Sequence, residues 1–535
     1  MFKSLAMAAL PISLLGAGLP ESRIVVTLPP ALADDASGRL LVFAEPATPS
    51  NATADNVDSD GPSSSVSIAG RDVAGFGGSR SVNLDIDDQA YPTPLSALKP
   101  GEYRVQVVLD RDGDYNYGGR RAGDLVSKVV TLQLPLITAP AIALDHALPS
   151  DAAQFDLTGI SPTAVVQINA ARPNLHEEVM PSPALTRFAA SERSIRAWVL
   201  TPPGYDPTAR RTYPTVYTAG GFGATHRLDG LQLSRQWHLM ETGVIPPMIW
   251  VTLDYATPNG TTEFADSVNN GPWGQTLVGE VIPYLERRYR MDAEPSSRFL
   301  TGHSSGGWFA LWAMVRYPKM FGGSWATSPD PVDFHDFLGV DLYAARANIY
   351  RDASGAPRPL ERANGSVRAT IEQLARREIV VGGNGGQLRS FEWTFSPRRI
   401  DGAPAPMFNR QTGAVDPEVV AHWGSNYDIG ARIRSDWPRI GKKLDGKIHV
   451  VVGTDDSFYL DGSVRRLEAD IASVGGHAEF TYVPGASHSM SAVYASGTDR
   501  NALWRSMTSA MCIVARPKGN GCTAPQYVAG SKGAR

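Results

Sequence analysis

Cysteine is nearly absent from this chain, with only Cys512 and Cys522 among its 535 residues. Two cysteines cannot build a disulfide scaffold, and too few ligands surround them for a metal-site pattern. An excess of one charge is lacking as well, because 54 acidic residues nearly balance 50 basic ones and no long basic run occurs. This balance gives no support for a nucleic acid or an anionic membrane as a partner. We expect no metal and no cofactor.

The sequence also lacks an apolar run long enough to span a bilayer. An apolar stretch over residues 5–15 is short and broken by Pro11, with Lys3 before it and residues 16–18 reading Gly-Ala-Gly after it. This order is typical of a secretory signal with a small-residue cleavage site. We therefore predict a signal peptide over residues 1–18 and a secreted or periplasmic protein. The alternative is an apolar first strand of the mature protein.

Residues 20–145 differ from the rest of the chain in their sequence pattern, which consists of short, often alternating apolar segments separated by Ser, Gly, Pro and Asp. This pattern predicts an all-β sandwich (Ig-like) domain. Residues 146–185 are predicted to be a linker. Within the first domain, residues 110–116 place oxygen-bearing side chains at alternate positions, as calcium loops do. Glycine falls at the wrong place for an EF-hand and Arg121 replaces the closing glutamate, so we favour a solvated hairpin turn.

Residues 302–307 read Gly-His-Ser-Ser-Gly-Gly, at the point where an apolar strand is predicted to change into a helix. Gly-x-Ser-x-Gly in this context is typical of a nucleophile elbow, a strained turn that exposes the serine hydroxyl. Gly302 and Gly306 leave room for the neighbouring backbone at so sharp a bend. We predict Ser304 as the nucleophile. The alternative is a plain turn that joins a strand to a helix.

A carboxylate and a histidine follow in the order that such elbows need. Asp456 lies in the loop after a predicted buried strand, where an acid faces the ligand crevice. It is preferred over Asp455 because the catalytic acid usually lies three residues after the glycine at the strand end, in a Gly-x-x-Asp pattern. In this interpretation Asp455 is a solvated or helix-capping residue. His488 follows the next predicted strand and is the predicted base. His303, beside the serine, and His226, in the glycine loop, could also reach the site, but an elbow directs the side chain of the serine's neighbour away.

The chemistry explains why these residue types are needed together. A serine hydroxyl is a weak nucleophile, so an imidazole must take its proton and later deliver it to the leaving group. A buried carboxylate holds the imidazole in the correct tautomer. The tetrahedral intermediate needs two N–H donors for its oxyanion. We predict the backbone N–H of Ser305 as one donor and that of Gly221 or Phe222, in a glycine loop after a predicted strand, as the other.

Four segments resemble the esterase D-like "putative esterase" group of α/β-hydrolases, which includes feruloyl esterases, S-formylglutathione hydrolase, siderophore esterases and mycolyltransferases. They are residues 194–205, residues 213–214, the glycine loop at 219–223 and residues 302–307. The resemblance covers residues 186–515 and implies an α/β-hydrolase catalytic domain with Ser304, Asp456 and His488 as its triad. In two departures, Ala219 replaces the usual histidine before the glycines and a long insertion follows Ser328.

The insertion, at about residues 330–440, mixes Pro and Gly with aromatic residues. A segment this long is typically a lid over the site. Trp423 and Tyr427 are predicted to line the substrate pocket, with packing inside the lid as an equally weighted alternative. Trp273, on a loop before a helix, is a third predicted substrate contact. Residues 516–535 are predicted to be a C-terminal tail, and in an oxidising compartment Cys512 and Cys522 can form a small staple there.

The sequence therefore predicts an exported serine carboxylic-ester hydrolase that works through an acyl-enzyme. Its expected partner is a small or polymer-linked ester, in particular an acylated carbohydrate or an aromatic ester. Acyl transfer or peptide hydrolysis on the same fold is one alternative. A non-catalytic binding protein on a hydrolase scaffold is the other.

Overall fold

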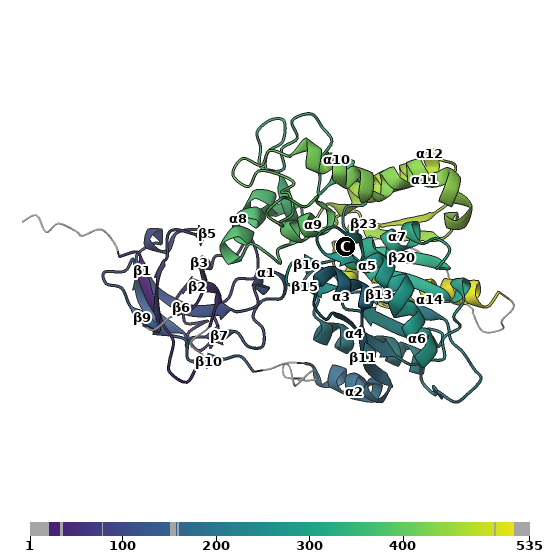
Figure 1. Ribbon diagram of the computed structural model, residues 1–535, viewed down its shortest axis with the longest axis horizontal. Coiled ribbons are helices and arrows are strands. Elements are labelled where there is room, and N and C mark those ends of the chain that lie inside the picture. The colour runs from purple at the N-terminus through teal and green to yellow at the C-terminus, as the bar shows by residue number, and fades with distance from the viewer. Residues whose placement is uncertain are drawn as a thin grey trace, which may run out of the picture.

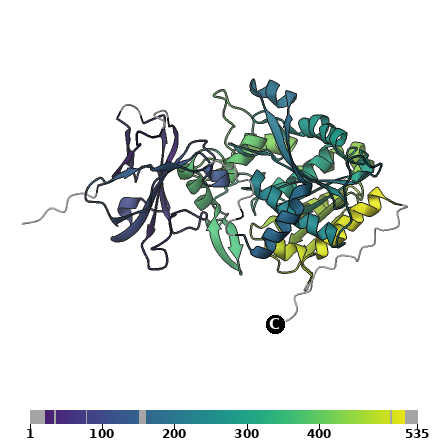
Figure 2. The ribbon, with the colours of Figure 1, turned by 90° about the horizontal axis from the view of Figure 1, so that it is seen from below.

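The computed structural model describes residues 21–32, 36–76, 79–149, 157, 160–496 and 499–517. The predicted signal peptide and Cys522 lie outside the described residues, as does all of the predicted tail except residues 516–517, so these stay predictions. Figure 1 shows the N-terminal strands as a separate body beside a larger body of helices and strands. Figure 2 shows the same division from below.

The N-terminal region, residues 21–149, consists of two sheets. One has the order β4-β1-β9 and the other the order β10-β7-β6-β2-β3-β5, with β8 paired to β6. The bounds are β1 (Arg23–Thr27), β2 (Gly38–Pro46), β3 (Ser67–Val73), β4 (Ser81–Asp85), β5 (Ala90–Tyr91), β6 (Gly101–Asp110), β7 (Leu125–Val126), β8 (Val130–Leu134), β9 (Ala141–Ala143), β10 (His146–Ala147) and the short helix α1 (Tyr115–Gly118). Ile24 from the first sheet and Val107 from the second are fully buried in one apolar cluster. The two sheets therefore enclose a common core.

An eight-stranded sheet of order β11-β12-β14-β13-β19-β20-β23-β24 organises the C-terminal region. Pairing is antiparallel at β11, β12 and β14, and parallel from β14 onward to β24. The bounds are β11 (Leu175–Pro181), β12 (Ser194–Leu200), β13 (Thr215–Ala219), β14 (Ile249–Leu253), β19 (Arg298–His303), β20 (Gly323–Thr327), β23 (Ile448–Gly453) and β24 (Glu479–Val483). Strands β14 and β20 are buried at every residue. This is the pattern of parallel strands that helices cover on both faces.

Helices flank this sheet, and two short hairpins follow β14 in the chain. The helices are α2 (Pro162–Ala171), α3 (Pro183–Ala189), α4 (His226–Glu241), α5 (Trp273–Thr276), α6 (Ile282–Arg288), α7 (Ser305–Arg316), α12 (Leu460–Ser473), α13 (Met490–Tyr494) and α14 (Ala502–Ala515). The hairpins pair β15 (Ala256–Thr257) with β16 (Gly260–Thr261) and β17 (Asp266–Ser267) with β18 (Gly271–Pro272). Helix α7 is buried along almost its whole length.

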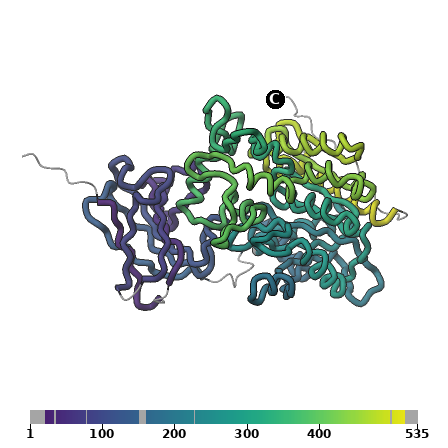
Figure 3. Tube along the Cα trace, turned by 45° about the horizontal axis from the view of Figure 1, so that its top comes forward, coloured from purple at the N-terminus to yellow at the C-terminus, as the bar shows by residue number. Residues whose placement is uncertain are grey.

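Between β20 and β23 the chain leaves the sheet and forms a hairpin and four helices. These are β21 (Pro359–Ala363), β22 (Ser366–Thr370), α8 (Ile371–Val381), α9 (Gln387–Phe395), α10 (Pro417–Asn426) and α11 (Ile429–Leu444). Figure 3 shows much of this green segment between the N-terminal strands and the rest of the C-terminal region, whereas α11 packs against α12. The Arg39 guanidinium on β2 donates to the Val380 carbonyl at 2.8 Å, and Val380 packs in an apolar cluster with Leu41 and Phe43. The insertion thus contacts both regions.

The structure differs from the predicted linker over residues 146–185. Residues 175–181 form β11, the edge strand of the large sheet, and helices α2 and α3 flank it. The prolines in this stretch start helices instead of breaking them. Pro162 and Pro183 each occupy a first helical position, after Ser161 and Ser182, whose hydroxyls accept a backbone N–H of the first turn.

Candidate active site

Ser304 lies on the sharp turn between β19 and α7, as the sequence predicts for an elbow. Its backbone has φ 58° and ψ −124°, a conformation that residues with a side chain seldom adopt. A Cβ on Gly302 would lie 2.1 Å from the Gly306 carbonyl oxygen, and a Cβ on Gly306 would lie 2.2 Å from that of Ala219. Only glycine fits at these two positions, so the turn depends on the spacing of the motif.

His488 and Asp456 form a hydrogen-bonded pair at the ends of the neighbouring strands. The His488 Nδ1 lies 2.9 Å from Oδ2 of Asp456. The Asp456 side chain is fully buried and that of His488 is 16% exposed. Burial raises the pKa of the Asp456 carboxyl, but hydrogen bonds from His488 and the Phe458 N–H outweigh burial, so the pKa lies below its usual value. Asp455, the alternative acid, is exposed.

The imidazole of His488 lies next to the nucleophile turn. Its ring centroid is 4.6 Å from that of His303, the residue before Ser304. His303 itself points to Thr327, with Nδ1 2.9 Å from Oγ1. Burial, together with the charge of nearby His488, lowers the pKa of His303 to about 3, so this ring stays neutral. His226 is engaged elsewhere, with Nε2 2.9 Å from Oε1 of Glu177.

A second carboxylate, which the sequence analysis did not identify, contacts the nucleophile turn. The Ser304 hydroxyl donates to Oδ1 of Asp330 at 3.2 Å, and the Ser305 hydroxyl donates to Oδ2 at 2.6 Å. Burial raises the pKa of the Asp330 carboxyl above its usual value. Asp330 follows the end of β20, the strand beside β19. Its position at a strand end is the signal that could have identified it, by the rule that selects Asp456.

Glu263 is another buried acid close to Asp330. Its Oε1 accepts a hydrogen bond from Thr261 at 2.7 Å, whereas Oε2 has no partner among the described residues. Burial first, and then the charge of Asp330, hold the pKa of Glu263 well above its usual value. Two carboxyls so placed favour their protonated forms, because two negative charges cannot be held together away from water.

The predicted oxyanion donors lie on two sides of Ser304. Ser305 is the first residue of α7, and a Cβ on Gly221 would lie 3.4 Å from the Ser304 Cβ. Among the described residues, none accepts a hydrogen bond from the N–H of Ser305, Gly221 or Phe222. These N–H groups are thus available, and the positive end of a helix dipole adds to the one at α7.

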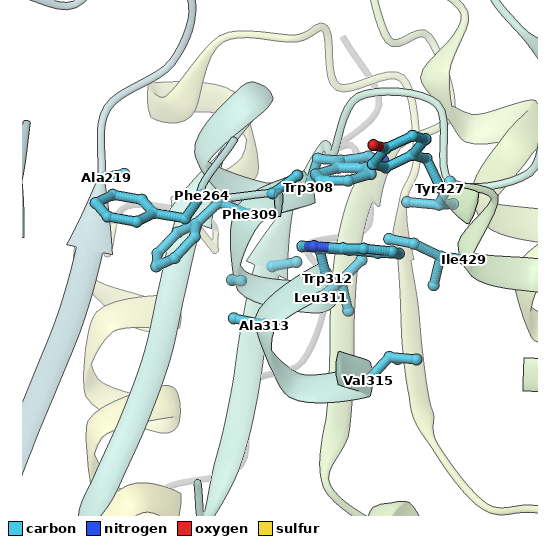
Figure 4. Packing of buried hydrophobic residues seen from close by; sticks show 14 of the residues in the cluster. Ala219, Phe264, Trp308, Phe309, Leu311, Trp312, Ala313, Val315, Tyr427 and Ile429 are labelled. Atoms are coloured by element: carbon cyan, nitrogen blue, oxygen red, sulfur yellow. The ribbon is translucent and has the colours of Figure 1, made fainter. Parts of the chain in front are cut away.

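The three aromatic residues predicted to contact substrate are packed inside the C-terminal core. Trp273, Trp423 and Tyr427 are 7%, 0% and 6% exposed. Trp423 donates to the Ser396 hydroxyl at 2.9 Å, and Tyr427 donates to the Asp266 carbonyl at 2.9 Å. Figure 4 shows Tyr427 beside Trp308 and Trp312. Packing replaces the predicted substrate contact at these positions, because large aromatic surfaces are stabilised most by burial.

The described residues contain no group of three or more His, Cys, Asp or Glu side chains that could hold a metal ion. Within the same residues, no helix has the length and apolar character needed to cross a membrane.

The chain is similar to several known proteins. A Bacillus subtilis (strain 168) protein, "Uncharacterized protein YbbA", is 29% identical over an alignment of 120 residues that covers 19% of this chain and 48% of that protein. The match thus spans about half the length of this relative. A solved structure of a ferulic acid esterase is 16% identical, covering 64% of this chain and 98% of its own, with a TM-score of 0.35. An S-formylglutathione hydrolase from Agrobacterium tumefaciens is 13% identical, covering 64% and 95%, with a TM-score of 0.35.

A family model described as "Putative esterase" matches residues 189–513. This match includes β12, the turn at Ser304 and the loops that hold Asp456 and His488. It extends over more than half of the sequence, and the chain therefore belongs to this esterase family of α/β-hydrolases.

Proposed function

We propose that this esterase is a serine hydrolase that uses Ser304, His488 and Asp456 as a triad. The observation that carries the proposal is the 2.9 Å contact between His488 and the buried Asp456 carboxylate, next to a strained serine turn. Nδ1 of His488 is engaged by Asp456, so Nε2 is left as the atom that takes a proton from the Ser304 hydroxyl. The lowered pKa of Asp456 supports this role, because an ionised carboxylate fixes the imidazole tautomer.

The reaction proceeds in two halves. The Ser304 oxygen attacks the ester carbonyl while His488 takes its proton, and collapse of the intermediate passes that proton to the departing alcohol. The acyl group is then bonded to Ser304. Water attacks this acyl-enzyme with His488 as base, which releases the carboxylic acid and restores the serine. In both halves the N–H of Ser305 and that of Gly221 or Phe222 stabilise the oxyanion.

Asp330 sets a condition on this mechanism. The Ser304 hydroxyl donates to Asp330 in the structure, and it must rotate toward His488 before it can attack. An ionised Asp330 would hold the hydroxyl and oppose the negative charge of the oxyanion. Burial raises the pKa of Asp330, which favours the neutral carboxyl and so weakens both obstacles.

The same contact also favours a second candidate. A serine hydroxyl engaged by Asp330 instead of His488 is what a non-catalytic binding protein on a hydrolase scaffold would show. In that case the wild-type protein would hydrolyse no ester in a broad panel, although it would still bind one.

We further propose that residues 20–145 form a β-sandwich domain and that the insertion at about 330–440 acts as a lid. The common core of the two N-terminal sheets supports the first of these. Acylated carbohydrates or aromatic esters as substrates, and export directed by residues 1–18, rest on the sequence alone. Acyl transfer and peptide hydrolysis on the same fold are separated from ester hydrolysis by product analysis with an added alcohol or a peptide substrate.

The test is turnover of 4-nitrophenyl acetate and of acetyl, feruloyl, long-chain and glycosyl esters by the wild type and by Ser304→Ala. We expect the variant to lose at least about 10³-fold in kcat, since the residual rate comes from binding and the oxyanion donors alone. Equal rates for the two proteins on every ester would overturn the triad proposal.

A further inference from the structure

Helix α1 of the N-terminal region reaches across to the glycine loop that follows β13. The Tyr117 ring on α1 packs edge-on against the ring of Phe222, with centroids 5.1 Å apart and planes at 83°. Tyr117 is 5% exposed. Figure 1 shows α1 on the side of the N-terminal strands that faces the C-terminal region, beside β15 and β16. A residue from outside the esterase-family segment thus contacts the loop predicted to bind the oxyanion.

The contact between α1 and the loop also involves the backbone. Gly223 has φ +80°, and a Cβ there would lie 3.2 Å from the Tyr117 carbonyl oxygen. The loop contains Gly220, Gly221 and Gly223, so its own sequence restrains its conformation weakly. The Tyr255 hydroxyl donates to the Gly220 carbonyl at the start of the loop, and α1 is in position to hold the N–H groups of residues 221 and 222 beside Ser304.

Helix α1 is itself firmly held. The Asn116 side-chain amide donates to the Glu378 carbonyl at 3.0 Å and to the Gly382 carbonyl, both at the end of α8. Tyr115 is 4% exposed, packs in a cluster with Val380, and donates from its hydroxyl to Asp58. Contacts with the N-terminal sheet and with α8 therefore fix the position of Tyr117, and Tyr117 in turn restrains Phe222.

The aromatic ring of Tyr117, not its hydroxyl, makes this contact. Among the described residues, none accepts a hydrogen bond from the Tyr117 hydroxyl. Burial, followed by the charges of Asp229, Asp254 and Glu263, raises the pKa of Tyr117, so the hydroxyl stays neutral. Phenylalanine at this position would keep the packing.

We infer that Tyr117 is a positioning residue for the oxyanion loop, through which the N-terminal region sets the catalytic rate of the esterase. The inference rests on the proposed function. Its physical basis is that a displacement of about 1 Å in a catalytic group costs on the order of a hundredfold in rate. A loop released from Tyr117 would weaken binding of the transition state far more than binding of the ester.

The experiment measures kcat and KM on 4-nitrophenyl acetate for the full-length wild type, Tyr117→Ala, Tyr117→Phe and Tyr103→Ala. It also measures inhibition by an aryl trifluoromethyl ketone, whose hemiketal oxyanion needs both N–H donors. Tyr103 is the matched control, because it is a tyrosine of the same region, is 6% exposed, and packs in the core between the two sheets. We expect Tyr117→Ala to lower kcat by about 10–100-fold and ketone affinity in proportion, with KM within about threefold. Tyr117→Phe and Tyr103→Ala should keep both values within about threefold.

Phe222→Ala tests the same contact from the other side if Tyr117→Ala does not fold. It should reproduce the loss of kcat, and the double variant should lose no more than either single one. The inference is overturned if both alanine variants keep wild-type kcat and ketone affinity, or if Tyr103→Ala loses as much as Tyr117→Ala. An inactive wild type overturns the proposed function and this inference with it, whereas an active wild type matched by Tyr117→Ala overturns the inference alone.

Discussion

Both regions of the molecule bury carboxyl groups, but Asp110 and Asp330 have different hydrogen-bond partners. In the N-terminal region, Asp110 is 1% exposed and its carboxylate accepts the N–H of Gly113 and that of Tyr115 at 2.9 and 3.1 Å. In the C-terminal region, Asp330 accepts the hydroxyl of the predicted nucleophile, and Oε2 of Glu263 has no partner among the described residues. A buried carboxylate that accepts the backbone N–H groups around it stabilises a loop. A buried carboxyl that contacts a reacting group marks a site.

The largest difference between the regions is expected when a buried charge is removed from each. Asp456→Asn should lower kcat by about 10⁴-fold, because the amide favours the wrong tautomer of His488. Arg104, 3% exposed on β6 and paired with Glu45, is the counterpart in the N-terminal region. Arg104→Met should lower the free energy of unfolding by about 1–3 kcal/mol, because Glu45 loses its partner, and should leave kcat within about twofold.

Steady-state kinetics and urea unfolding of these two variants check the comparison. A loss of kcat in Arg104→Met as large as that in Asp456→Asn would break it, since buried charge would then matter for catalysis wherever it lies. Wild-type kcat in Asp456→Asn would remove Asp456 from the mechanism.

A smaller effect separates two buried groups, one in each region, by the sign of their response to acid. Burial and the charge of His488 lower the pKa of His303 to about 3. Between pH 6.5 and 4.5 the unfolded imidazole thus binds a proton that the native one excludes, and the protein loses stability as the pH falls. Burial raises the pKa of Asp124 to about 6. Here the native carboxyl binds a proton before the unfolded one does, so the protein gains stability over the same range.

Urea unfolding at pH 6.5, 5.5 and 4.5 measures these slopes. His303→Asn should lose less stability on acidification than the wild type, by up to about 1.4 kcal/mol per pH unit. Asp124→Asn should lose more than the wild type. Slopes parallel to the wild type in both variants would show that neither group titrates as its burial implies.

Local patterns in the sequence predicted the turn at Ser304, because the glycine spacing that permits a sharp bend lies within residues 302–307. They also predicted that Asp456 and His488 lie in loops after successive parallel strands, and the structure brings the two side chains together. The rule that an acid after the end of a parallel strand faces the ligand crevice also applies to Asp330, which follows the end of β20.

Other features depend on contacts between distant segments and leave no local signal. Tyr117 meets Phe222 only because the N-terminal region packs on the insertion. Aromatic residues such as those at 273, 423 and 427 are common in ligand pockets, yet all three side chains are buried in the core. Edge strand β11 was hidden by prolines that start the helices on either side of it.

Covalent labelling with a fluorophosphonate, followed by peptide mass spectrometry, tests the activated serine most directly. The probe reacts with a serine whose proton a neighbouring base can accept, so it reports on the geometry around residue 304 without any choice of substrate. We expect one adduct, on Ser304, that is absent from Ser304→Ala and forms far more slowly in His488→Ala. An unlabelled wild-type protein, or an adduct that forms equally fast without the imidazole, would contradict it.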